Sequence, residues 1–331
     1  MKLAIIGGGS WGTALAIVLA PRSESVTLWV YEADLAATMT RTRVNDIFLP
    51  GFKLPEGVQV VTDLATALGD ADIVLGVMPS HHARGIYTAM LPYLTPSLIL
   101  VSATKGLEQG SLLRVSQVIE QVVGAKFLPR IAVLSGPTFA REVAAGNPTA
   151  VVVASSSPEV ARGVQHAFSG PTFRLYTNGD PAGVEVGAAL KNVIAIGAGI
   201  CEGLGLGHNP TAALITRGLA EITRLAIAMG GQARTLAGLA GLGDLVLTCS
   251  GELSRNRHVG KELGRGKQLR EILGSMRMVA EGVETCGSAV ALGEKFAADL
   301  PIIQQMHAVL SAGKSPKEAV RDLMDRTLKG E

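Results

Sequence analysis

The stretch KLAIIGGGSWGTALAIVLA (residues 2–20) decides the fold of this chain. Its first five residues form a short apolar run that predicts a strand, and Thr13–Leu19 predicts the start of a helix. Between them, Gly7, Gly9 and Gly12 have the G-x-G-x-x-G spacing. In such a turn the first glycine permits the tight bend, the second lets the backbone approach a pyrophosphate, and the third lets the helix lie against the strand. Since the helix N-terminus favours phosphate, the stretch predicts a dinucleotide site.

The same segment also resembles a secretory signal peptide, because Met1-Lys2 precedes an apolar run that ends near Ala20. Three successive glycines with the fingerprint spacing argue against that interpretation. A second strand, Val26–Val30, is predicted directly afterwards, as a βαβ unit requires. We therefore interpret the segment as a dinucleotide-binding turn.

Length and composition predict a compact protein with two domains. The chain has 331 residues, of which 47% are hydrophobic and 18% charged, unlike a disordered chain. The net charge is +2 without a basic run and aromatic residues are only 4%, so neither nucleic acid nor an acidic membrane surface is predicted as a partner. No apolar stretch of about 18 residues runs without a break or a charge, so no membrane-spanning helix is expected.

Cysteine and histidine patterns predict no metal site. Cys201, Cys249 and Cys286 are widely spaced and form no C-x-x-C, which suits structural thiols in a reducing compartment. The six histidines show no H-x-x-x-H or H-E-x-x-H pattern, and the neighbours His81 and His82 fit a loop.

The first 180 residues alternate strand and helix signals, which predicts an α/β domain, Rossmann-like, with a doubly wound and mostly parallel sheet. Strands are expected at 2–6, 26–30, 58–61, 72–78, 97–102, 131–135, 150–154 and 172–176. Helices are expected at 10–20, 32–41, 82–91, 111–123 and 158–168.

Residues 181–331 show only helical signals and predict an all-helical second domain. Helices are expected at 181–201, 211–229, 255–263, 267–273, 281–297, 301–311 and 316–328. No long polar stretch separates the two halves, so the join near residue 180 is expected to be packed.

Three polar segments follow predicted strands, at 78–80, 102–106 and 135–138. Because ligands of open α/β sheets bind beyond the carboxyl ends of the strands, we expect these segments to meet at one edge. Lys105 lies in the second of them beside a glycine. A ligand role and an ordinary exposed lysine are both open for it.

Lys191 stands in an apolar, glycine-rich helical stretch with no acidic residue three or four positions away. Either its ammonium group reaches solvent, or it needs a partner from elsewhere in the chain. Asp244, beside glycines in a predicted tight loop, is the candidate partner, and the alternative is a simple turn aspartate. The cluster Ser254-Arg255-Asn256-Arg257 follows further along the chain. Its donors suit a phosphate, but the same residues also fit an ordinary helix start that is capped by Ser254.

Seven blocks in order, over essentially the whole chain, resemble the bacterial-type NAD(P)-dependent glycerol-3-phosphate dehydrogenases. They are GGGSWGTALA (7–16), SATKGLE (102–108), LSGPTFAREVA (134–144), ALKNVIAIGAG (189–199), GLGDLVLTC (241–249), SRNR (254–257) and AEGV (280–283).

The resemblance implies reversible reduction of dihydroxyacetone phosphate to sn-glycerol 3-phosphate, a precursor of glycerophospholipids, by a cytoplasmic enzyme that is expected to be a homodimer. It implies that Lys191 is the catalytic proton donor or acceptor, with Asn192 and Thr248 as supporting residues. The substrate-binding residues it implies are Lys105, Gly136, Thr138, Lys191, Asp244, Ser254, Arg255 and Asn256. The cofactor-binding residues are Gly7, Gly9, Ser10, Trp11, Gly12, Tyr31, Lys105, Ala140, Arg255, Val279 and Glu281.

One position departs from the family pattern. Tyr31 stands after the second strand, where relatives often have Arg or His facing the adenosine ribose, so the choice between NADH and NADPH stays open. No acid ends that strand at Val30, while Glu32 and Asp34 lie just beyond it. Two other functions stay open as well: a dehydrogenase of the same build for another hydroxy acid or ketone, and a non-catalytic dinucleotide sensor.

Overall fold

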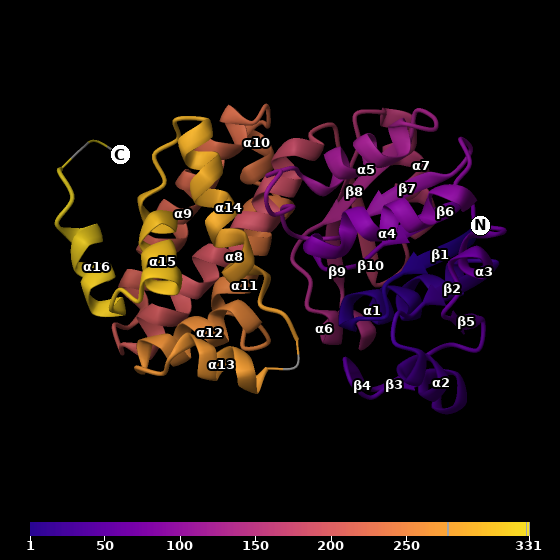
Figure 1. Ribbon diagram of the computed structural model, residues 1–331, viewed down its shortest axis with the longest axis horizontal. Coiled ribbons are helices and arrows are strands. Elements are labelled where there is room, and N and C mark those ends of the chain that lie inside the picture. The colour runs from indigo at the N-terminus through magenta and orange to yellow at the C-terminus, as the bar shows by residue number, and fades with distance from the viewer. Residues whose placement is uncertain (277, 329, 331) are drawn as a thin grey trace.

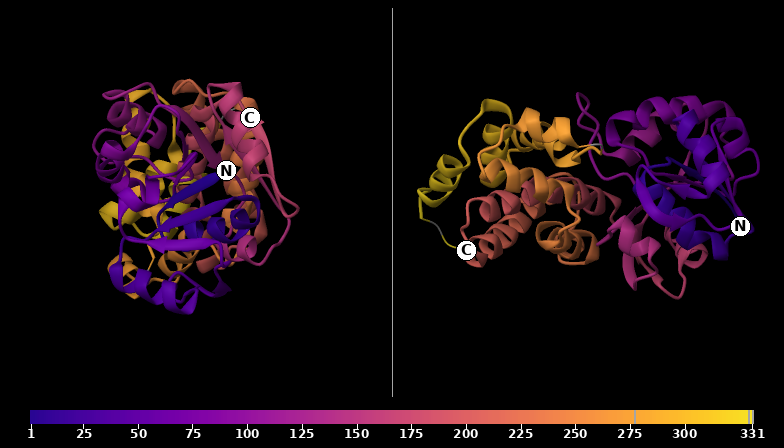
Figure 2. Two further views of the ribbon diagram at one scale, coloured as in Figure 1. Left: turned by 90° about the vertical axis from the view of Figure 1, so that its right-hand side faces the viewer. Right: turned by 90° about the horizontal axis from the view of Figure 1, so that it is seen from below.

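The computed structural model describes residues 1–276, 278–328 and 330. A half that contains a sheet and a half built of helices lie side by side along the longest axis (Figures 1 and 2). Eight strands form one sheet in the order β10-β9-β8-β7-β6-β1-β2-β5. Their bounds, close to those expected, are β1 (Lys2–Ile6), β2 (Ser25–Trp29), β5 (Val58–Val61), β6 (Ile73–Gly76), β7 (Ile99–Ser102), β8 (Arg130–Ser135), β9 (Thr149–Ala154) and β10 (Phe173–Asn178).

The sheet is mostly parallel, as predicted. Neighbouring strands run parallel except β8 and β9, so β9 and β10 oppose the other six. The carboxyl ends of β6, β7 and β8 therefore meet at one edge, next to the turn that follows β1.

Helices cover both faces of the sheet, which makes it doubly wound. Side chains of β1 alternate between two apolar cores, because successive residues of a strand point to opposite faces. Leu3 and Ile5 pack with α1 (Ser10–Leu19), α2 (Ala33–Thr42) and α7 (Pro158–Phe168). Ala4 and Ile6 pack with α3 (Leu64–Leu68), α4 (Ala83–Met90) and α5 (Val115–Gly124).

Five elements of this half differ from the sequence prediction. The hairpin β3 (Val44–Asn45) and β4 (Leu49–Lys53) and the short helices α3 and α6 (Ala140–Ala144) were not predicted, since none is long enough for a clear periodicity. The helix expected at 111–123 begins only at Val115, because Arg114 pairs with Leu107 in an isolated β-bridge.

The described residues after Asn178 contain helices and no strand. The helices are α8 (Pro181–Gly203), α9 (His208–Ala228), α10 (Ala233–Leu236), α11 (Asp244–Ser250), α12 (Arg255–Gly264), α13 (Leu269–Ser275), α14 (Glu281–Lys295), α15 (Pro301–Ala312) and α16 (Pro316–Met324). The short helices α10 and α11 were missed by the sequence prediction, whereas the other seven lie near their expected bounds.

Helix α8 is the centre of the helical half. Its neighbour α12 lies so close that a Cβ on Gly199 would sit 2.0 Å from the Arg257 carbonyl oxygen, and one on Gly260 1.9 Å from that of Ile196. By length and composition alone α8 could cross a membrane, but the apolar window that qualifies is completely buried by the protein. A predominantly apolar helix that is covered by other helices has the pattern of a core helix.

Candidate active site

The glycine turn after β1 has the geometry that the fingerprint predicts. Gly7 has φ +131°, and a Cβ there would lie 2.2 Å from the Val77 carbonyl oxygen. A Cβ on Gly12 would lie 1.9 Å from the carbonyl oxygen of Gly7. A Cβ on Gly9, in contrast, would meet no atom within 4 Å. The packing of the protein thus requires Gly7 and Gly12, whereas Gly9 borders open space.

The donors around that space suit a pyrophosphate. Helix α1 begins at Ser10 with no side-chain cap and no acidic residue in its first turn, so its N–H groups and positive dipole end stay available. The indole Nε1 of Trp11 is buried without a hydrogen-bond partner. An anionic ligand would satisfy these groups, so the residues present fit a dinucleotide.

Two of the other predicted cofactor residues lie near the same turn. Tyr31 follows β2, is 78% exposed and touches the Trp29 ring edge-to-face with the centroids 6.0 Å apart. Ala140 begins α6 and packs on the same core as α1. Val279, which precedes α14, is 39% exposed.

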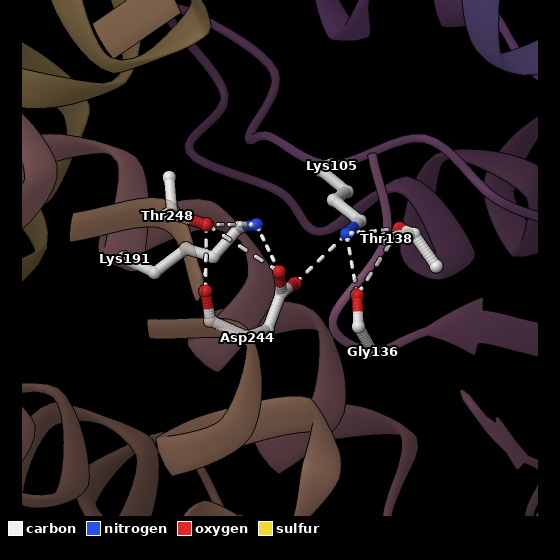
Figure 3. Close-up of polar contacts among 6 residues, drawn as sticks. All are labelled: Lys105, Gly136, Thr138, Lys191, Asp244 and Thr248. Atoms are coloured by element: carbon white, nitrogen blue, oxygen red, sulfur yellow. Dashed lines mark hydrogen bonds and ion pairs between the residues drawn. The ribbon is translucent and has the colours of Figure 1, made fainter. Parts of the chain in front are cut away.

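The three polar segments at the strand ends converge, as expected. The Thr104 hydroxyl donates to the Met78 carbonyl oxygen at 2.9 Å, which joins the first two segments. The Lys105 ammonium donates to the Gly136 carbonyl oxygen at 3.0 Å and to the Thr138 hydroxyl at 3.2 Å. It also donates to Asp244 Oδ2 at 2.8 Å, which joins the two halves of the protein (Figure 3). Lys105 is therefore not an ordinary exposed lysine, because it is held by three partners from two separate segments, 136–138 and the start of α11.

Lys191 is buried at 5% exposure, so its side chain does not reach solvent. Its ammonium group donates to Asp244 Oδ1 and, at 2.8 Å, to the Thr248 hydroxyl. The predicted pairing of Lys191 with Asp244 is confirmed. The predicted loop around Asp244 is wrong: Asp244 is the first residue of α11, after a π-helical turn at Leu239–Gly243. A helix places Thr248 one turn after Asp244, on the same side.

Burial lowers the pKa of Lys191 to about 7, because an apolar surrounding disfavours the ammonium form. The carboxylate of Asp244 opposes this effect, and the nearby positive charge of Lys105 adds to it. An ammonium group with a pKa near neutrality can both give and take a proton at ordinary pH.

The start of α12 carries the polar cluster singled out in the sequence. Ser254 is its N-cap, with its hydroxyl oxygen accepting from the Arg257 amide at 3.2 Å, so the capping interpretation is confirmed. Asn256 is buried and accepts from the Gly282 amide at 2.9 Å. Among the residues that the structure describes, the Arg255 guanidinium forms no hydrogen bond or close ion pair.

Glu281, the first residue of α14, faces this cluster. Burial raises its pKa to about 7, with Glu284 adding to the effect and Arg255 opposing it. Its Oε2 accepts from the Ser80 hydroxyl, 3.2 Å away, which links the end of β6 to the helical half. Burial lowers the pKa of Arg255, and Glu281 counteracts this.

Two polar contacts near the site were not predicted from the sequence. Ser80 lies in the polar segment 78–80, but nothing in the sequence indicates its contact with Glu281. Asn45 is fully buried in the hairpin and donates to the Gly8 carbonyl oxygen at 2.8 Å. Neither contact has a local sequence signal, because each joins elements far apart in the chain.

The comparisons with known proteins agree with this geometry. Family models of the N-terminal and C-terminal parts of NAD-dependent glycerol-3-phosphate dehydrogenase match residues 2–161 and 180–321. A glycerol-3-phosphate dehydrogenase [NAD(P)+] of Koribacter versatilis is 58% identical, covering 98% of this chain and 97% of the relative. One from a Geobacter species is 54% identical, covering 100% and 98%.

A solved structure gives the same result in three dimensions. The crystal structure of glycerol-3-phosphate dehydrogenase from Coxiella burnetii superposes with a TM-score of 0.94 at 41% identity, covering 98% of this chain and 99% of that one. Sequence and fold therefore agree over the whole length. The chain belongs to the NAD-dependent glycerol-3-phosphate dehydrogenase family and is an NAD(P)-dependent oxidoreductase.

Proposed function

We propose that this chain interconverts dihydroxyacetone phosphate and sn-glycerol 3-phosphate, with Lys191 as the group that gives or takes the proton. The observation that carries the proposal is the burial of Lys191 against Asp244, whose other oxygen binds Lys105. A buried, ion-paired lysine lies here where the helical half meets the half that carries the dinucleotide-binding turn. Its ammonium group is suited to a substrate that is negatively charged and can be reduced.

The bound nicotinamide supplies the hydride, and the protein supplies position and charge. An ammonium group has three N–H donors. Asp244 and Thr248 accept two of those of Lys191, which leaves the third for the substrate oxygen. As negative charge develops on that oxygen, Lys191 stabilises it and delivers the proton; in the oxidation direction Lys191 accepts the proton.

Thr248 and Asp244 orient Lys191 together. The Thr248 hydroxyl donates to the Asp244 backbone carbonyl at 2.6 Å, so its oxygen lone pairs are directed at the lysine. Lys105, held by Gly136 and Thr138, adds positive potential on the opposite side of Asp244. Two ammonium groups around one carboxylate leave a net positive charge, which favours an anionic substrate.

Arg255 is the proposed phosphate ligand, with Ser254 and Asn256 beside it. Its guanidinium has no hydrogen-bond partner among the described residues, and it can bind two phosphate oxygens at once. Glu281 and Val279 are assigned to the cofactor, in line with the family resemblance. A cytoplasmic homodimer, and two domains divided near residue 180, complete the proposal.

The test is the loss of NADH or NADPH absorbance when dihydroxyacetone phosphate is added to the purified protein, with each cofactor in a separate run. Rapid oxidation of either cofactor is the expected result. The ratio of the two rates measures the preference for NADH or NADPH, which the residue at Tyr31 leaves open. The absence of oxidation, in protein that binds one of the cofactors, would overturn the assignment of the substrate.

A further inference from the structure

Asn45 is a buried amide whose hydrogen-bonding groups are all used. Its Nδ2 donates to the Gly8 carbonyl oxygen and to the Thr13 hydroxyl, each at 2.8 Å. Its Oδ1 accepts from the Phe48 amide at 3.0 Å, within the β3–β4 hairpin. The side chain is 0% exposed. The amide of Asn45 thus connects this hairpin to the glycine turn and to the first turn of α1.

The bond to Gly8 controls the next N–H along the chain. In a trans peptide the carbonyl oxygen of one residue and the N–H of the following residue point in opposite directions. Since the Gly8 oxygen is directed at Asn45, the Gly9 N–H points away from the hairpin. That N–H makes no hydrogen bond within the described part of the chain. Gly9 itself borders the open space, where a Cβ would touch nothing within 4 Å.

We infer that Asn45 is a positioning residue for the dinucleotide: it holds the Gly8–Gly9 peptide so that the Gly9 N–H is directed at a phosphate of the cofactor. The two donor bonds of Asn45 explain why a polar residue is buried at this place, since an unpaired amide there would be costly. The bond to Phe48 alone would suffice to shape the hairpin. The bonds to Gly8 and Thr13 act on the turn that receives the phosphates.

Removal of the amide should weaken dinucleotide binding through the orientation of one peptide. Loss of one well-directed hydrogen bond corresponds to about a tenfold rise in Kd, or about 1.4 kcal/mol. The KM for dihydroxyacetone phosphate should stay the same, because Asn45 touches none of the residues around Lys191.

The experiment compares three variants of the full-length protein: Asn45→Ala, Leu49→Ala and Thr13→Val. Leu49 is the matched control, since it is buried in the same hairpin and packs on the core of the sheet half. For each variant, the Kd for NADH and for ADP-ribose is measured by titration well below the melting temperature, and the melting temperature is measured separately. ADP-ribose contains the pyrophosphate but no nicotinamide, so it reports on the turn alone.

Asn45→Ala should raise both Kd values about tenfold, while Leu49→Ala leaves them within about twofold for a similar loss of thermal stability. Thr13→Val loses the long 3.5 Å contact of the Thr13 hydroxyl with the Gly8 carbonyl oxygen but keeps the 2.8 Å bond from Asn45, so it should have a smaller effect than Asn45→Ala. Unchanged Kd values for Asn45→Ala would overturn the inference, and so would an equal rise for Leu49→Ala. If Asn45→Ala does not fold, Asn45→Leu is uncharged and similar in size but lacks the two donors, and it should show the same rise.

Discussion

The carboxylate of Asp244 binds the ammonium group of Lys105 at 2.8 Å across the boundary between the two halves of the protein. The other oxygen of the same carboxylate binds Lys191 (Figure 3). Lys105 comes from the sheet edge and Asp244 from the start of α11. The electrostatic state of Lys191 therefore depends on how the two halves are packed together, and this dependence can be tested.

Lys191→Ala should lower kcat by about 10²–10⁴-fold, the usual contribution of a positioned general acid. The Kd for NADH should change little, because Lys191 is bonded to Asp244 and Thr248 rather than to the glycine turn. Steady-state kinetics and a binding titration measure the two effects. Turnover near that of the unsubstituted enzyme would remove Lys191 from the acid–base role.

Lys105→Gln should move the pH profile of ketone reduction to higher pH. Reduction requires protonated Lys191, so its rate falls as pH rises through the pKa of that lysine, at about 7. Lys105 lowers this pKa, and its removal should therefore raise it. The measurement is kcat against pH in the reduction direction. If kcat is lower but declines at the same pH as in the unsubstituted enzyme, Lys105 acts in substrate binding and does not set the pKa of Lys191.

Arg255→Ala should raise the KM for dihydroxyacetone phosphate by about 10–100-fold, since a charge-assisted hydrogen bond contributes about 1.5–3 kcal/mol. The control substrate is dihydroxyacetone, which lacks the phosphate and should be used about equally poorly by both proteins. An equal loss with both ketones would show that Arg255 does not bind the phosphate.

Gly9→Val and Gly12→Val form a matched pair that separates folding from binding. The new side chain at residue 9 would enter space where the protein has no atom within 4 Å of a Cβ, whereas a Cβ at residue 12 collides with the Gly7 carbonyl oxygen. Gly9→Val should keep its melting temperature but lose cofactor binding, and Gly12→Val should lose stability. Normal NADH binding by folded Gly9→Val would contradict the placement of the pyrophosphate.

Glu221→Gln should flatten the dependence of stability on pH. Glu221 on α9 is buried and accepts the Ile302 and Ile303 amides, at 2.7 and 3.2 Å, at the N-terminus of α15. Burial raises its pKa from 4.5 to about 7 in the folded state. The folded protein then binds the proton more tightly than the unfolded chain, so this group's contribution to stability falls as pH rises from about 4.5 to about 7. Urea unfolding of both proteins at pH 5 and pH 8 measures the slope; equal slopes would contradict the expectation.

The sequence by itself determined the features that short segments encode. The glycine spacing after Lys2–Ile6 predicted the turn, because the requirement for residues without a Cβ is a property of the local backbone. Alternation of apolar runs predicted the eight strands of the sheet, because runs such as Ile73–Gly76 are buried on both faces. The apolar surroundings of Lys191 left two alternatives, a side chain that reaches solvent or a distant partner, and Asp244 was the candidate partner.

Only the tertiary structure decided which residues meet. Asp244 lies 53 positions from Lys191 and 139 from Lys105, and Asn45 lies 37 positions from Gly8. No local periodicity encodes such contacts, since they arise when separate helices and strands pack their apolar faces and bring polar groups together as a consequence. The ion pairs of Asp244 with both lysines, and the hydrogen bond from Asn45 to the Gly8 carbonyl oxygen, therefore result from folding. No sequence motif encodes them.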